Sequence, residues 1–300
     1  MDWLERMNRA LNYIEENLAA EIDFKTAAAV ACCSVYHFQR MFSFITDIPL
    51  SDYIRRRRLT LAAFDLRNND VKVIDLALKY GYDSPVSFTR AFQKLHGVTP
   101  TSARKTGVRL KAYPRLSFHI SLRGDKEMNY KIVEKAEFPV IGKTLRVSTV
   151  NEAQLKRIPR FWDEVKQDST ASKLVDIAKQ GEAGQTGKKI LGICTDSNDN
   201  NEFSYVIGVE NTAKAEYPEF DAFSIPAATW GVFEVIGPMP GAIQELFKRI
   251  YTEFFPTSGY ERAAGPDLEL YYEGDCNSPD YRSEIWIPVV YAKDQQPVSR

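Results

Sequence analysis

Aromatic residues and two carboxylates in the second half of the chain form a pattern that suits the binding of a cation. Aromatic ring faces attract positive charge, and a carboxylate removed from water completes the charge match. Glu284 opens the apolar run of residues 285–290, and a carboxylate at the edge of a buried strand is often functional. We therefore expect a site for a lipophilic cation or an amphipathic molecule, formed by Trp162, Tyr205, Trp230, Glu269, Tyr271, Glu284 and Trp286. The alternative explanation for any single aromatic residue is ordinary core packing.

A repeat in the first half carries polar side chains suited to nucleic acid. The sequence Phe-Gln-Arg-Met-Phe at residues 38–42 returns as Phe-Thr-Arg-Ala-Phe at residues 88–92, and Ser34 and Ser84 stand four residues before the copies. Phenylalanines at i and i+4 share one helix face, which leaves a polar face to reach base edges and phosphates in the major groove. The polar faces predicted from this spacing contain Tyr36, Gln39 and Arg40 in the first copy and Ser87, Thr89, Arg90 and Gln93 in the second.

The repeat predicts two helix-turn-helix units, because a shorter helical segment precedes each polar helix. These segments cover residues 26–31 and 73–80, and Gly81 permits the tight turn in the second copy. A long helix over residues 50–66 joins the units, which would let one chain enter two successive major-groove faces about 34 Å apart. An amphipathic helix over residues 2–18 precedes both units.

Four consecutive arginines at residues 55–58 lie on the connecting helix. Three interpretations stay open: a solvated charge cluster, contact with phosphates, or packing against acidic groups.

Charge is unevenly distributed along the chain. Residues 1–109 contain sixteen Lys and Arg and twelve Asp and Glu, a net charge of +4, whereas residues 110–300 contain twenty-three and twenty-eight, a net charge of −5. The first half therefore suits a polyanion better than the second. No apolar run approaches the length of a membrane span and the N-terminus has no signal pattern, so we expect a cytoplasmic protein. The four cysteines lack paired spacing, so we expect no zinc site, no other metal and no cofactor.

The second half predicts an α+β domain of two β-β-α-β-β units that share an antiparallel sheet with helices on one side. The first unit comprises strands 129–136 and 140–149, helix 155–167, and strands 190–195 and 203–210. The second comprises strands 220–225 and 229–236, helix 241–254, and strands 268–273 and 284–292. We expect a multidomain chain: an all-α tandem helix-turn-helix DNA-binding domain (1–109), a linker (110–127) in which residues 116–122 alternate as a strand would, and the α+β domain (128–292).

The first half resembles the DNA-binding domain of the AraC/XylS family. The resemblance rests on residues 34–42, on Tyr-Ile-Arg-Arg-Arg-Arg-Leu at 53–59, on residues 77–92 and on Gly-Val-Thr-Pro at 97–100. It implies DNA contacts from Tyr36, Gln39, Arg40, Val86, Ser87, Thr89 and Arg90.

This chain departs from the AraC/XylS pattern at three places. Cys32 and Asp47 stand where the family usually has glycine, and we expect these small side chains to adopt the backbone angles required there. Pro85 and Val86 stand where polar residues that contact bases are common. We therefore expect the first unit to dominate sequence specificity.

Residues 128–292 resemble the GyrI-like effector-binding domain, which is also found in multidrug-sensing regulators. The matching segments are Met-Asn-Tyr-Lys-Ile at 128–132, Trp-Gly-Val-Phe at 230–233, Gly-Pro-Asp-Leu-Glu-Leu-Tyr at 265–271 and Glu-Ile-Trp-Ile-Pro at 284–288. The resemblance implies that Glu284 lies in the ligand pocket. Glu269 is matched as well, although the direction of its side chain does not follow from the sequence.

The main hypothesis is a sequence-specific transcription regulator, an activator, that binds double-stranded DNA, responds to a small-molecule effector and acts on RNA polymerase. A second hypothesis is hydrolysis of a reactive small molecule with a glutamate as general base. No Ser-His-Asp, Cys-His or metal constellation supports it, so we expect no enzyme. A third hypothesis is a sequestering module, against which the attached DNA-binding half argues.

Overall fold

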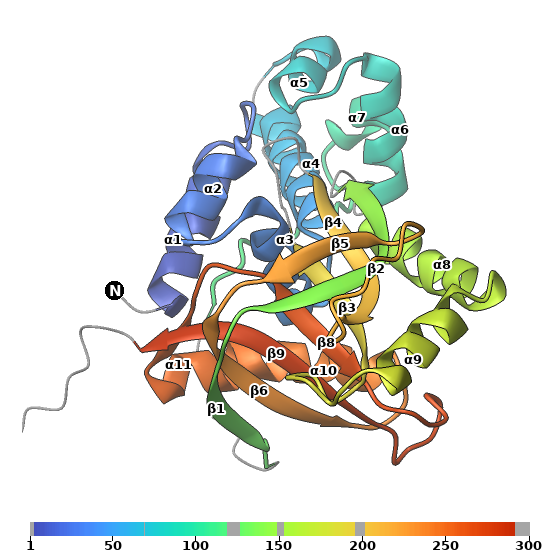
Figure 1. Cartoon of the computed structure of the whole chain (residues 1–300). Helices are drawn as coiled ribbons and strands as arrows, with labels where there is room; N and C mark the ends of the chain where they lie inside the picture. The colour runs from blue at the N-terminus through green and yellow to red at the C-terminus, as the bar shows by residue number, and fades with distance from the viewer. Residues whose placement is uncertain (1–2, 69, 119–126, 149–152, 196–201, 292–300) are drawn as a thin grey trace, which may run out of the picture. The chain divides into compact units, whose positions relative to one another are not determined.

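The computed structural model describes residues 3–68, 70–118, 127–148, 153–195 and 202–291, and the chain divides into two compact units. Unit 1 covers Met1–His119 and is helical, and unit 2 covers Ile120–Arg300 and is built on a β-sheet (Figure 1). Among the described helices, none combines the length and apolar character needed to cross a bilayer.

Unit 1 consists of two helix-turn-helix pairs joined by a long helix. The first pair is α2 and α3, the second is α5 and α6, and α4 connects them. In chain order the helices are α1 (Trp3–Glu16), α2 (Phe24–Val30), α3 (Val35–Thr46), α4 (Leu50–Asn68), α5 (Val73–Lys79), α6 (Pro85–His96) and α7 (Pro100–Ala103). The predicted tandem arrangement is therefore confirmed.

The second helix of each pair begins with the same capping interaction. The Ser34 side chain accepts a hydrogen bond from the backbone N–H of His37, and the Ser84 side chain accepts one from that of Ser87. These caps satisfy backbone donors that the first helical turn leaves without partners. The two matched serines of the repeat thus fix where both polar helices start.

The two pairs differ in how they build left-handed turns. Gly81 and Gly97 have φ angles of +73° and +79° in the second pair, whereas Cys32 and Asp47 each have φ +55° at the corresponding positions of the first. Left-handed backbone costs a non-glycine residue about 1–2 kcal/mol. The first pair therefore adopts the expected turns at an energetic cost that the second avoids.

A buried ion pair ties the extended segment 113–118 to the helices of unit 1. The Arg57 guanidinium contacts the Glu15 carboxylate at 2.8 Å, and the two side chains are 10% and 6% exposed. Arg57 also donates to the Tyr113 carbonyl, and the Tyr53 hydroxyl accepts from the Leu116 N–H. The segment is thereby held against α1 and α4.

The expected strand at residues 116–122 is wrong where the structure describes it. Residues 116–118 form no strand, and residues 119–122 lie outside the described residues. Phe118 is buried because it packs against Phe42 of α3, and Asn8 exchanges two hydrogen bonds with the Phe118 backbone. Packing on the helices, rather than pairing in a sheet, produces the alternation.

Unit 2 contains an antiparallel sheet, as predicted, with nine described strands instead of the expected eight. Their order is β1-β6-β9-β8-β3-β4-β2-β5, and β7 pairs with β9. The first half of the unit comprises β1 (Tyr130–Lys135), β2 (Phe138–Ser148), α8 (Gln154–Gln167), α9 (Thr170–Gln180), β3 (Ile190–Thr195) and β4 (Glu202–Glu210). The second half comprises β5 (Asp221–Ile225), β6 (Ala228–Ile236), α10 (Gly241–Arg249), the π-helix η2 (Ile250–Phe254), α11 (Phe255–Ser258), β7 (Tyr260–Arg262), β8 (Asp267–Tyr271) and β9 (Arg282–Tyr291). The duplication holds, and α9 and β7 are additions that the sequence pattern did not predict.

The sheet has two chemically distinct faces, because side chains alternate along each strand. We call the face that carries Leu268 and Leu270 the inner face; its apolar cluster includes Val133 of β1 and Ile225 of β5. These strands lie at opposite ends of the sheet order, so the sheet curls around this cluster. We call the opposite face the helix face, because Trp162 of α8 and Phe254 of η2 contact it.

Glu15→Gln should lower the free energy of unfolding of unit 1 by about 3 kcal/mol, because Arg57 would be left buried without its counter-charge. Burial raises the pKa of Glu15, but hydrogen bonds from Arg57 and Tyr53 and the Arg57 charge outweigh it and lower the pKa. The ion pair therefore contributes stability above about pH 4.5 and loses it as the pH falls below that value. Urea denaturation between pH 3 and pH 7 would measure both effects.

The exposed neighbour Glu16→Gln is the matched control and should change the stability little. Equal losses in the two variants, or no loss of the Glu15 contribution at low pH, would contradict a stabilising role for the pair.

Candidate functional site

The polar face of α3 is more deeply packed than its sequence suggested. Tyr36 is buried, and its hydroxyl accepts a hydrogen bond of 3.1 Å from Arg40 Nη1. The Arg40 guanidinium also lies 5.8 Å from the Tyr36 ring centroid and 5.3 Å from that of Phe44. Gln39, like Arg40, is half-buried. This geometry suits Tyr36 to positioning the Arg40 guanidinium.

The polar face of α6 is open to solvent. Val86, Ser87 and Arg90 are exposed, Thr89 is half-buried, and Phe88 and Phe92 on the other side are fully buried. Val86, one of the predicted DNA contacts, is 68% exposed at the start of this helix, where the AraC/XylS family commonly has a polar residue. The i, i+4 spacing of the phenylalanines thus predicted the buried face correctly.

The four consecutive arginines of α4 contact neighbouring groups within unit 1. Arg55 and Arg56 both pair with Asp52, and Arg57 pairs with Glu15. Arg58 donates to the carbonyls of residues 18 and 20. Of the three interpretations, packing against acidic groups and backbone carbonyls describes these contacts.

A carboxylate surrounded by aromatic side chains lies on the helix face of unit 2. Glu269 is 8% exposed, and its Oε2 accepts hydrogen bonds from the hydroxyls of Tyr205 (3.1 Å) and Tyr271 (2.9 Å). Trp162 of α8 donates its indole N–H to the Tyr205 hydroxyl (2.9 Å), and its ring centroid lies 5.0 Å from that of Tyr271. We call these four residues the Glu269 cluster.

Burial and the nearby negative charge make the two tyrosines harder to ionise. Desolvation raises the pKa of Tyr205 and that of Tyr271 well above the usual value, and the Glu269 charge raises both further. Both hydroxyls therefore stay neutral hydrogen-bond donors at physiological pH.

Gly192 of β3 makes room for this arrangement. A Cβ atom at this position would lie 2.4 Å from the Tyr205 hydroxyl oxygen and 3.0 Å from Glu269 Oε2. The backbone of β3 thus approaches the polar atoms more closely than any side-chain-bearing residue would allow.

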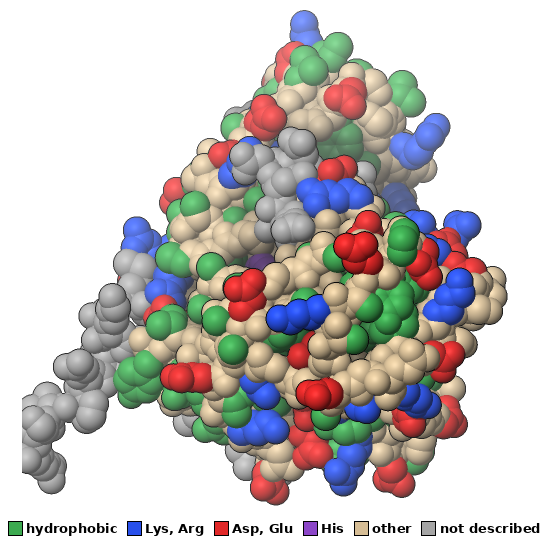
Figure 2. Space-filling model, viewed as in Figure 1, with side chains coloured by type: hydrophobic (Ala, Val, Ile, Leu, Met, Phe, Trp, Pro, Cys, Tyr) green, Lys and Arg blue, Asp and Glu red, His purple; other side chains and the backbone are tan. Residues whose placement is uncertain are grey.

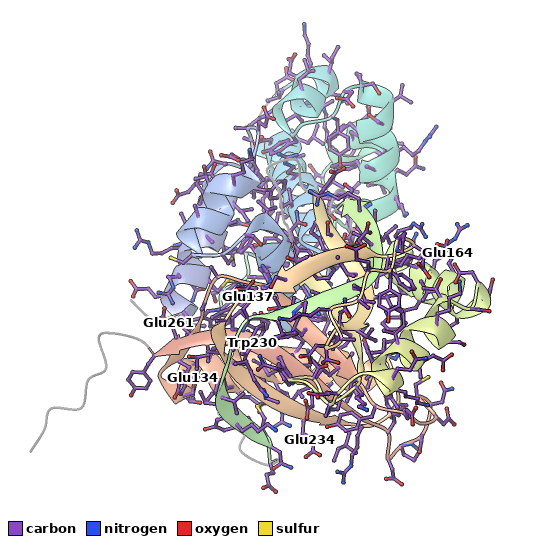
Figure 3. The ribbon with its side chains drawn as sticks, in the orientation of Figure 1. Glu134, Glu137, Glu164, Trp230, Glu234 and Glu261 are labelled. Carbon is purple, nitrogen blue, oxygen red and sulfur yellow. The ribbon has the colours of Figure 1, made fainter. Side chains whose placement is uncertain are left out.

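The other three predicted effector residues lie on the inner face, on the opposite side of the sheet. Register pairs Glu284 with Leu270 and Trp286 with Leu268, and Trp230 belongs to the same inner cluster. Glu284 accepts from the Trp286 indole N–H at 2.7 Å, and Trp230 lies 6.0 Å from Trp286 between ring centroids. Figure 3 shows Trp230 among the strands. The single cage expected from the sequence is therefore divided into two groups by the sheet.

Sequence reasoning missed Gly192, Tyr272, Lys135 and Lys189. The Tyr272 hydroxyl donates to Glu284 Oε1 at 2.8 Å, and the two lysines lie over the rings of this second group. Parity along β8 and β9 could have separated Glu269 from Glu284. Lys135 lies at the end of β1 and Lys189 directly precedes β3, and neither had a signal in the sequence.

A surface cavity of about 830 Å³ lies elsewhere in unit 2. Its lining comes from the start of β2, from β5 and from residues 211–218, and includes none of the predicted effector residues. Acidic and basic side chains are interspersed over the face shown in Figure 2. Within the described residues, no three His, Cys, Asp or Glu side chains gather as a metal site would require.

Comparison with known proteins assigns both units. Residues 128–290 match the GyrI-like small molecule binding domain, and residues 27–106 match a helix-turn-helix domain. The Right origin-binding protein of Escherichia coli K12 is 27% identical over 96% of this chain and 99% of its own length. The HTH-type transcriptional activator AarP of Providencia stuartii is 38% identical over 33% of this chain and 73% of its own.

A solved structure similar to unit 2 is that of SAV2435 bound to tetraphenylphosphonium. It is 26% identical, has a TM-score of 0.47, and covers 54% of this chain and 94% of that one. The family match spans more than half of the chain and follows the helix-turn-helix match directly. The chain is therefore an AraC-type helix-turn-helix transcription regulator that belongs to the GyrI-like small molecule binding domain family.

Proposed function

We propose that this regulator is an activator that recognises promoters through α3 and α6 and responds to a lipophilic or amphipathic cation bound at the Glu269 cluster. The observation that carries the effector part is the burial of the Glu269 carboxylate beneath aromatic side chains. We propose that the protein binds and releases the effector without chemically converting it. We also propose that the protein acts in the cytoplasm, where it recruits RNA polymerase when bound to DNA.

The chemistry of the Glu269 cluster favours a cation with an apolar body. Hydrogen bonds and a nearby cation both stabilise a carboxylate in apolar surroundings, and Tyr205 and Tyr271 supply hydrogen bonds from their hydroxyls. A ligand cation would add a full charge match. The rings of Trp162 and Tyr271 supply apolar and π surface for the rest of the ligand.

Entry to the cluster is most direct beside Trp162. This residue is half-buried on α8, whereas Tyr205 and Glu269 are buried beneath it. A ligand that enters beside the Trp162 indole, above Tyr205, would reach the carboxylate. Any effect on DNA binding then requires that the ligand bind two states of the protein with different affinity.

The first experiment is selection of fragmented genomic DNA from the host by the full-length protein at moderate salt. Two successive recognition helices should enrich a few promoters that share an asymmetric motif of about 20 base pairs. Enrichment that disappears with small increases in salt would reflect non-specific phosphate binding and would count against promoter recognition.

On such a promoter, Arg90→Ala should weaken binding by about 1–3 kcal/mol if this exposed arginine contacts a base. Arg40→Ala should weaken it to a similar extent, because Tyr36 and Phe44 hold its guanidinium in place. Fluorescence anisotropy on the selected promoter and on a scrambled sequence would measure both.

Lys173→Ala, an exposed lysine of unit 2, is the control and should bind both DNAs as the wild type does. Equal losses on the two sequences would identify a phosphate contact, and no loss on either would remove the residue from the interface.

Glu269→Gln should weaken binding of tetraphenylphosphonium at least tenfold, because the buried negative charge is lost while the shape is kept. The neutral analogue triphenylphosphine oxide should bind both proteins equally. Isothermal titration calorimetry on the full-length protein would measure the affinities.

Glu284→Gln is the matched control on the inner face and should leave the affinity for the cation nearly unchanged. A large effect of Glu284→Gln together with none of Glu269→Gln would move the cation site to the inner face.

Gly192→Ala should reduce cation affinity without removing any polar group, because its Cβ would push Tyr205 away from Glu269. We also expect a stability loss of about 1–3 kcal/mol from overpacking. Gly241→Ala, where a Cβ would meet nothing within 4 Å, is the control and should bind the cation normally. Unchanged cation binding in Gly192→Ala would show that the spacing between Tyr205 and Glu269 is irrelevant to the ligand.

A further inference from the structure

The inner face carries a second polar cluster, on the side of the sheet opposite Glu269. Glu284 lies at its centre, where Oε1 accepts from the Tyr272 hydroxyl and Oε2 from the Trp286 indole N–H. Lys135 Nζ lies 5.3 Å from the Trp286 ring centroid, and Lys189 Nζ lies 4.4 Å from that of Tyr272. The ammonium groups of Lys135 and Lys189 thus lie over the rings of Trp286 and Tyr272, and both of these residues donate a hydrogen bond to the Glu284 carboxylate.

Positive charge exceeds negative charge in this cluster, because Glu234, the register partner of Glu284, pairs with Arg282 at 3.6 Å and leaves Glu284 facing three lysines. Lys131, Val133 and Lys135 alternate along β1 and share one face, and Val133 packs against the inner apolar cluster. Within the described part of the chain, no carboxylate oxygen lies within ion-pair distance of Lys131, Lys135 or Lys189. Burial lowers the pKa of Lys189, and the charges of Lys131 and Lys135 lower it further, whereas only Glu284 raises it.

Backbone carbonyls hold the ammonium groups in place. Lys135 Nζ donates to the Gln185 carbonyl at 3.3 Å, and Lys189 Nζ donates to the Thr186 carbonyl at 3.1 Å. Residues 185 and 186 lie in a turn that is itself held in place, because the Glu210 carboxylate accepts hydrogen bonds from the backbone N–H groups of Gln185 (2.7 Å) and Thr186 (2.8 Å). Each ammonium has three donors, so donors remain for a ligand.

Trp230 provides a second, independent indication that a ligand with hydrogen-bond acceptors fits here. It is fully buried, and its indole N–H has no hydrogen-bond partner among the described residues. Buried donors are rarely left without an acceptor, and each exception calls for a water or ligand. Because Trp230 packs on Trp286, this donor belongs to the same aromatic group as the lysine cluster.

We propose that the inner face binds a small organic anion, with an aromatic or aliphatic body against Trp286 and Tyr272 and an acidic group on Lys135 and Lys189. The chemical class is a carboxylate, sulfonate or phosphate ester of an apolar molecule. This site is separate from the Glu269 cluster and does not depend on the function proposed there. One sheet would then bind ligands of opposite charge on its two faces.

Isothermal titration calorimetry of the full-length Glu269→Gln variant, in which the proposed cation site has lost its charge, with 2-naphthoate, 2-naphthamide and 2-naphthylmethylammonium tests the charge preference of the inner face alone. We expect 2-naphthoate to bind at least tenfold more tightly than the other two compounds. The double variant Lys135→Gln, Lys189→Gln should lose that advantage and keep the weak affinity for 2-naphthamide. The control pair Lys156→Gln, Lys173→Gln, two exposed lysines elsewhere in unit 2, should keep it.

Glu284→Gln should change the affinity for 2-naphthoate in the opposite direction to the lysine substitutions. Removing this negative charge should tighten 2-naphthoate binding severalfold, because the carboxylate beside Trp286 and Tyr272 repels the ligand's acidic group. A merely structural Glu284 would give no such gain. Glu269→Gln should leave 2-naphthoate binding unchanged, which separates this site from the cation site.

Equal affinities for the three naphthyl compounds would overturn the proposal, as would full 2-naphthoate binding by the double lysine variant. Weaker 2-naphthoate binding in Glu284→Gln would also contradict it, since the ligand would then depend on the carboxylate rather than on the lysines.

Discussion

The alternation of side chains across the curled antiparallel sheet is the constraint on which the chemistry of unit 2 depends. Residues 269 and 284 lie on adjacent strands, yet they are out of phase, since Glu284 pairs with Leu270 and Glu269 pairs with Ile285. Their carboxylates therefore enter different environments: a helix-covered aromatic cluster on one side, and an inner face with three lysines on the other. A shift of β9 by one residue in register would turn Glu284 to the helix face, the face that carries Glu269.

Much of the fold follows from local sequence signals, because repeated spacing and capping residues are local. The i, i+4 phenylalanines and the serine caps predict both helix-turn-helix units, and the strands of the duplicated β-β-α-β-β pattern agree with the structure within a few residues. The strand predicted at residues 116–122 is wrong over 116–118 because packing on helices and pairing in a sheet can both produce an alternation of apolar and polar residues. The helix α9 was missed although Asp168 precedes it and accepts a hydrogen bond from the Thr170 N–H.

The candidate site could be predicted only in part, because it depends on contacts between distant strands. The sequence predicted seven aromatic and acidic residues, of which Trp162, Tyr205 and Tyr271 meet around Glu269. It placed Glu284 with them, since both carboxylates adjoin buried apolar runs. Lys135 of β1 and Lys189, which precedes β3, could not be associated with Trp286 from spacing alone, as 97 residues or more of chain separate them from it. In unit 1, likewise, the partners of Arg57 and Arg58 come from α1 and the chain after it.

The four tryptophans of the chain are distributed among the surfaces described above. Trp3 lies in α1, Trp162 lies beside Glu269, and Trp230 and Trp286 lie together in the inner cluster. Each proposed ligand site thus contains its own intrinsic fluorophore. Phenylalanine substitutions that leave one indole at a time would make the emission of this protein a site-resolved reporter, so that occupation of either face could be followed separately without an attached dye.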